Sequence, residues 1–158
     1  MSEDGEHTGF DRILRFTLPH RNARGRAVRL GPVLDEILSA HAYPAPIKHL
    51  LAEALALAAL LGSLLKEGAG QLTLQAQTEA GAVRLLACDY RGGELRGYVQ
   101  HEPDRVAALG PNPPLFALSG RGYLAITFDL AASGRRYQGI VPLEGGSLAE
   151  ACETYFAQ

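Results

Sequence analysis

The sequence predicts an α+β fold, with a mixed, largely antiparallel sheet and a long apolar helix and smaller helices packed on it. Alternating polar and apolar residues mark several strands, and glycine-rich links join some of them into hairpins. One long segment is apolar almost all round, as expected for a core helix. The chain has 158 residues, 47% of them hydrophobic and 20% charged. This length and composition fit one globular domain and exclude a disordered chain.

The first elements predicted are a lead, two strands and a helix. Residues 1–10 are polar and acidic, and we expect them to form a flexible lead. Strands are expected over 11–18 and 24–30, separated by a polar link. Gly31-Pro32 opens a helix because proline suits the first helical turn, and a proline-rich turn ends it.

The long apolar helix is expected over 46–66, with a stop at Gly68-Ala-Gly70. Leucine and alanine cover more than one of its faces, so it must be sandwiched inside the domain or against a partner. Lys48 and Glu53 interrupt the run, which leaves too few consecutive apolar residues to span a bilayer. We therefore predict a core helix and no membrane partner.

The second half of the chain is expected to be mostly strands. They are predicted over 71–77, 83–90, 95–101, 123–129 and 137–142. A proline-containing, irregular excursion over 102–119 separates the third of these from the fourth. Ser147 and Glu150 form a capping-box pattern, which predicts a final helix that runs to Gln158 without a stop signal.

The charge pattern supports two hypotheses. The net charge is −2, so the whole molecule is not an electrostatic nucleic-acid binder, and no nucleic-acid partner is expected. Basic side chains nevertheless crowd the first two strands without an acid between them: Arg12, Arg15, Arg21, Arg24, Arg26 and Arg29. Solvated strand positions and a charge-protected edge explain this pattern. The alternative is an RNA- or ribosome-associated binding module that uses the arginine-rich hairpin, for which steep weakening with salt would be the sign.

No catalytic constellation stands out in the sequence. Cys88 with His101 as its base is the nearest candidate, but Cys88 shares a strand face with Leu86, which is typical of a buried structural thiol. The histidines lack metal-ligand spacing, and two cysteines are too few for a disulfide framework or a structural zinc site. We predict a binding protein with no cofactor, no metal and no catalytic residue in this chain. A small-molecule enzyme using Cys88 or His101 is the third hypothesis.

Several segments share their order and spacing with one known family. They are Val28-Arg-Leu30, His41-Ala-Tyr-Pro-Ala-Pro-Ile-Lys48, Leu64-Leu-Lys66, the strand 71–77, Leu95-Arg-Gly97, Gly120-Arg-Gly-Tyr-Leu-Ala-Ile-Thr127, Arg136-Tyr-Gln-Gly-Ile-Val141, Leu143-Glu-Gly145, Ser147-Leu-Ala149 and Tyr155-Phe156. In this order they resemble the redox-regulated molecular chaperones of the heat-shock protein 33 family, or 33 kDa chaperonins. The resemblance extends from about Asp11 to Gln158.

The resemblance implies a cytoplasmic, ATP-independent holdase that binds unfolding or oxidatively damaged client proteins and prevents their aggregation. Family members hold zinc through four cysteines of a C-terminal domain, and oxidation of these cysteines to disulfides releases the zinc and exposes the client-binding surface. Residues 11–158 correspond to the chaperone core domain, truncated before the linker and the zinc-binding redox-switch domain. Cys88 and Cys152 therefore inherit none of the switch roles.

A chaperone of this kind needs exposed apolar surface. Candidate surfaces are the surplus face of the long helix, the segment 115–118 and the apolar stripe of the last helix. The candidate client-binding residues are Leu57, Leu61, Leu115, Phe116, Leu118, Tyr155 and Phe156. The alternative for each residue is a place in the core. The resemblance also implies a homodimer, and the open end of the last helix offers a route to domain swapping.

Overall fold

The computed structural model describes residues 11–65 and 70–158 and confirms the predicted α+β class. Its strands are β1 (Arg12–Leu18), β2 (Ala23–Arg29), β3 (Gln71–Thr78), β4 (Val83–Arg91), β5 (Glu94–His101), β6 (Gly122–Leu130) and β7 (Arg135–Pro142). Its helices are α1 (Pro32–Ser39), α2 (Ala45–Gly62), α3 (Pro103–Ala108), α4 (Leu115–Ser119) and α5 (Leu148–Phe156), with a 3-10 turn at Pro19–Arg21. The predicted lead and most of the predicted glycine stop after the long helix lie outside the described residues.

The strands form two antiparallel sheets. The larger sheet has five strands in the order β5-β4-β3-β6-β7, and β1 and β2 form a separate two-stranded hairpin. β3 is the central strand, where Leu74 pairs with Cys88 on one side and with Ile126 on the other. The tight turn between β4 and β5 places Gly92 and Gly93 at positive φ, which glycine adopts without steric cost.

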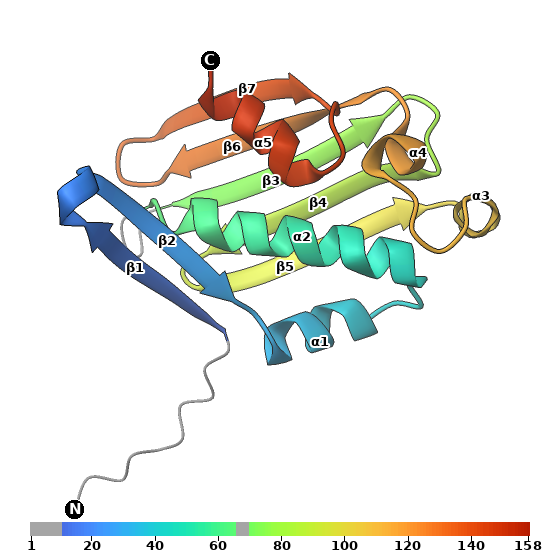
Figure 1. Ribbon diagram of the computed structural model, residues 1–158, viewed down its shortest axis with the longest axis horizontal. Coiled ribbons are helices and arrows are strands. Elements are labelled where there is room, and N and C mark those ends of the chain that lie inside the picture. Colours follow the sequence, from blue (N-terminus) through green and yellow to red (C-terminus); the bar gives the residue numbers. More distant parts are fainter. Residues whose placement is uncertain (1–10, 66–69) are drawn as a thin grey trace, which may run out of the picture.

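α2 and α5 cover one face of the five-stranded sheet, and the hairpin lies beside α2 (Figure 1). Ile47, Leu51 and Leu55 on α2 are fully buried, as the core-helix prediction requires. Full burial of each such side chain contributes about 1.5–3 kcal/mol. Of the described helices, α2 alone is long and apolar enough to cross a bilayer, but here it packs on β3, β4 and β5.

The structure differs from the prediction at two places. α2 ends at Gly62, because the chain then tightens into a turn in which Leu64 N–H and Leu65 N–H donate to the carbonyls of Leu61 and Gly62 (3.1 Å each). The excursion over 102–119 is not wholly irregular, since it contains α3 and α4. α3 begins with Pro103, and Pro114 directly precedes α4, because proline breaks a helix interior but suits a helix start.

The face of the five-stranded sheet opposite α2 and α5 carries polar side chains that link neighbouring strands. Thr73 Oγ1 donates to Asp89 Oδ1 (2.9 Å), and Arg96 forms an ion pair with Asp89 Oδ2 (3.3 Å). These groups belong to β3, β4 and β5, so their side chains link neighbouring strands across this face. The same face also carries the exposed side chains of Tyr98, Tyr123 and Ile140.

Candidate binding surface

The β1–β2 hairpin carries a row of exposed apolar side chains on one face. Leu14 is 63% exposed, Phe16 42% and Leu18 49%. They are alternate residues of β1, so they project from the same side of the ribbon. Across the hairpin they face the small residues Ala27, Gly25 and Ala23. We call Leu14, Phe16 and Leu18 the hairpin stripe.

Gly25 lets the Phe16 ring lie across β2. A Cβ atom at position 25 would overlap the Phe16 ring, so only glycine accommodates the ring in this position. The ring therefore covers the backbone of β2 with one face and leaves the other accessible. The hairpin stripe was not among the binding surfaces predicted from the sequence, because the pattern of arginines determined the interpretation of these strands. The alternation of Leu14, Phe16 and Leu18 is the signal that could have found it.

The structure places the seven predicted client-binding residues in three environments. Two are strongly exposed: Phe116 (63%) and Phe156 (55%). Two are partly buried against the core: Leu57 and Tyr155. Three are buried, with exposures of 8%, 5% and 3%: Leu61, Leu115 and Leu118. These three fill space in the core, so they add nothing to the accessible apolar surface of this conformation.

Tight capping and packing fix α5, which carries Tyr155 and Phe156. Ser147 Oγ accepts from Glu150 N–H (3.2 Å), as the capping-box prediction requires, while Glu150 Oε2 accepts from Gly146 N–H (2.7 Å). The Tyr155 ring packs directly over Gly139 of β7, where a Cβ atom would overlap it. The rings of Tyr155 and Phe156 meet edge to face with 4.9 Å between centroids. Phe156 is thus presented from an anchored helix.

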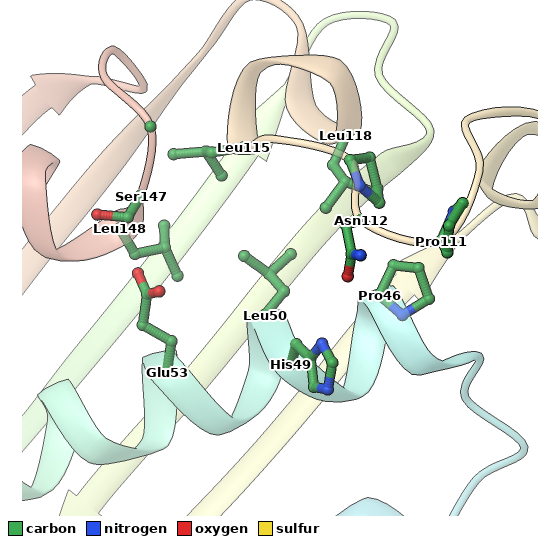
Figure 2. Close-up of a pocket in the computed structure, with 12 residues that line it drawn as sticks. Pro46, His49, Leu50, Glu53, Pro111, Asn112, Leu115, Leu118, Ser147 and Leu148 are labelled. Atoms are coloured by element: carbon green, nitrogen blue, oxygen red, sulfur yellow. The ribbon is translucent and has the colours of Figure 1, made fainter.

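A cavity of about 170 Å³ lies between α2, α4 and the start of α5 (Figure 2). Its walls include Leu50, Leu115 and Leu148, and Pro46 and Pro111 lie at one side. Glu53 of α2 points toward the start of α5, where its Oε1 accepts from Ala149 N–H (3.0 Å). Because small-molecule sites usually measure about 300–1,000 Å³, this cavity is smaller than a typical cofactor site. The hydrogen bond from Ala149 to Glu53 joins α5 to α2 at the wall of this cavity.

The two cysteines are buried, and burial disfavours ionisation of their thiols. Burial, with a smaller contribution from Asp89, raises the pKa of Cys88, and burial together with Glu53 raises the pKa of Cys152 to about 11. Cys88 pairs with Gly97, whereas His101 lies four residues further along β5, about 13 Å at the usual strand rise. The structure therefore separates the thiol from the base that the enzyme hypothesis needs. Within 11–65 and 70–158, no three His, Cys, Asp or Glu side chains are grouped to hold a metal ion.

Comparison with known proteins shows which class of protein this chain resembles. A 33 kDa chaperonin of Caulobacter vibrioides (strain NA1000) is 45% identical over 164 residues, which cover 100% of this chain and 54% of the relative. The 33 kDa chaperonin of Ectopseudomonas mendocina is 40% identical over 143 residues, covering 90% and 47%. The crystal structure of the 33 kDa chaperonin from Thermotoga maritima superposes with a TM-score of 0.74 at 26% identity, over 92% of this chain and 50% of that chain. In sequence and fold the chain is thus similar to the 33 kDa chaperonins.

The family assignment follows from a match over almost the whole chain. The family model described as Hsp33 protein matches residues 11–158. The chain belongs to the Hsp33 family, which confirms the resemblance found in the sequence. It spans about half the length of the curated relatives that it matches.

Proposed function

We propose that this chain is an ATP-independent holdase, which binds unfolding or oxidatively damaged proteins and prevents their aggregation. Its membership of a chaperone family supports this function. The structural observation that carries the proposal is the hairpin stripe, in which three adjacent large apolar side chains remain accessible on a folded scaffold. Surfaces of this kind mark interaction sites. Phe116 and Phe156 add exposed aromatic rings at two other places.

The exposed fractions of the three side chains in the hairpin stripe determine how much free energy a client gains by covering them. Each of the three side chains is roughly half exposed, so covering it gains about half of the 1.5–3 kcal/mol that full burial contributes, or about 1 kcal/mol. The stripe then contributes about 3 kcal/mol, which is too little for tight binding alone. Stable holding therefore requires several weak contacts with one client, and multivalent contact of this kind raises avidity without new chemistry. Weak, non-directional contacts also suit clients of unrelated sequence.

We further propose that these 158 residues hold clients without a redox or zinc switch, in the cytoplasm, and as a homodimer in which exchange of α5 is one route to pairing. The buried state of Cys88 and Cys152 supports the first part, because raised thiol pKa values suppress the thiolate that oxidation and metal binding require. No covalent chemistry is assigned to any side chain. The interaction with clients is binding alone.

Light scattering of a heat-unfolding client protein tests the proposal. The client is heated with and without an equal concentration of this chain, under reducing conditions and with a zinc chelator present. The proposal predicts that the chain suppresses the rise in scattering without ATP. An unchanged rise at all ratios up to a large molar excess of the chain would contradict the holdase function.

A pair of matched variants assigns the activity to the hairpin stripe. Leu14→Ser/Leu18→Ser removes two exposed aliphatic side chains of the stripe, and Leu109→Ser/Ile140→Ser removes two that lie on other elements. We expect the first variant to require about 30-fold more protein for the same suppression, since about 2 kcal/mol of contact is lost. The second variant should behave as the unchanged chain does. Equal behaviour of both variants would contradict the assignment.

A further inference from the structure

The second face of the β1–β2 hairpin is strongly basic. Arg15, Arg24 and Arg26 lie on the side opposite the hairpin stripe, as the alternation of the two strands dictates. All three are exposed. Six of the fifteen basic residues of the chain fall between positions 12 and 29, and none of its seventeen acidic residues does. The positive charge is thus concentrated on the hairpin, although the whole chain carries a net charge of −2.

The positions of these arginines are electrostatically unfavourable when no anion is bound to them. Arg15 and Arg26 are direct cross-strand partners, and like charges directly opposite each other destabilise a strand pair. Elsewhere in the structure, ion pairs join arginines to carboxylates, so the fold neutralises arginines where acids are near; these arginines are Arg84, Arg96, Arg105 and Arg136. Among the described residues, Arg15 Nη2 instead donates to the carbonyl of Ser63 at the end of α2 (3.4 Å). Its remaining N–H groups are available to a second acceptor.

We propose that this face, Arg15, Arg24 and Arg26, binds the phosphate backbone of single-stranded nucleic acid. Guanidinium groups match phosphate oxygens in charge and in bidentate geometry, and a bridging phosphate turns the Arg15–Arg26 repulsion into attraction. The charge complementarity between an acid-free basic face and a polyanion is the observation that carries this inference. It is independent of the proposed holdase function, because the hairpin stripe occupies the opposite face.

The width of the basic face favours one strand over a duplex. Neighbouring strands lie about 4.8 Å apart, so the arginines form a single narrow row along the hairpin. A duplex presents its two phosphate strands across a groove about 6 or 12 Å wide, which a row this narrow cannot contact on both sides. Arg12 and Arg29 share the face of the hairpin stripe, but Arg15, Arg24 and Arg26 project away from it, which disfavours an anionic membrane as the partner of these three. Contact with phosphates alone predicts binding without base preference.

Fluorescence anisotropy with a labelled oligouridine strand tests the inference on the whole chain. If three arginines contact phosphates, the slope of log K against log salt is about −2.1, so affinity falls about 20-fold between 50 and 200 mM salt. Arg24→Gln/Arg26→Gln leaves one contact, and the same salt step then costs only about threefold. The matched control is Arg121→Gln/Arg135→Gln, which removes the same charge from two exposed arginines outside the hairpin. It should retain the 20-fold dependence.

Competition with other polyanions decides the source of the phosphates. Unlabelled oligocytidine and single-stranded DNA should displace the probe as well as oligouridine does, whereas duplex RNA and polyglutamate should displace it at least tenfold less well. Equal loss of binding in both arginine variants would overturn the inference, as would a salt dependence below twofold. Stronger competition by polyglutamate or by anionic lipid vesicles would assign the face to an acidic protein or a membrane and would also overturn it. Suppression of client aggregation, measured on the same samples, reports on the holdase function separately.

Discussion

The contact between Tyr155 and Gly139 makes a sharp prediction about how α5 is held on the sheet. The Tyr155 ring occupies the space that a side chain at position 139 of β7 would fill, so Gly139→Ala forces the ring or the strand to move. Overpacking of this kind costs about 1–3 kcal/mol of unfolding free energy. In a strand without that ring, alanine is favoured over glycine by about 0.5–1 kcal/mol. The effect of the same substitution should therefore reverse its sign when Tyr155 is removed.

The double-mutant cycle measures this reversal. Unfolding in urea, followed by circular dichroism, gives the free energy of the unchanged chain, Gly139→Ala, Tyr155→Ala and the double variant. We expect Gly139→Ala to destabilise the chain in the first background and to stabilise it in the Tyr155→Ala background, with a coupling energy of about 2 kcal/mol. Costs that add within about 0.5 kcal/mol would show that the two residues do not share this space.

Other predictions test separate parts of the account. Arg26→Glu should raise the unfolding free energy by about 0.2–1 kcal/mol in urea, because it converts the Arg15 pair into one of opposite charge, and an unchanged or lower value would contradict the pairing. Ser147→Ala should cost about 1 kcal/mol through loss of the α5 cap, whereas Ser133→Ala, outside any helix, should cost much less. The free energy of unfolding should fall as the pH rises above about 9. Burial raises the pKa of Cys88, and that of Cys152 to about 11, above the ordinary value of 9.0, so both thiols ionise at a lower pH in the unfolded chain than in the folded one. Cys88→Ala/Cys152→Ala should flatten this decline, and an equally steep decline would refute its cause.

Features set by local chemistry were predictable from the sequence. The capping residues Ser147 and Glu150 predict the start of α5, and the paired glycines at 92 and 93 predict a hairpin. Both predictions succeed because each pattern determines the backbone conformation of only the few residues around it. The prolines over 102–119 did not reveal that this segment contains helices. Its effect depends on whether it falls inside a helix or at the start of one, and the pattern alone did not distinguish these positions.

The sequence could not predict which apolar side chains of the candidate site are accessible to solvent. Leu115 and Phe116 are neighbours in a short apolar segment, yet one is 5% exposed and the other 63%. The difference arises from the direction in which α4 faces the sheet, a property of tertiary packing. The hairpin stripe was missed for the converse reason: alternation normally indicates that the apolar face is covered, and here that face remains open.

Site-specific photo-crosslinking tests the central claim most directly. A photoreactive phenylalanine analogue at position 16 places the reporter in the hairpin stripe, and one at position 98, which is 45% exposed in the native chain, places it on the face of the larger sheet opposite α2 and α5. Mixed with a client during heating, the chain should form crosslinks from position 16 to the unfolding client and few from position 98, and neither position should capture the folded client. Efficient capture from position 98 with none from position 16 would contradict a client-binding role for the hairpin.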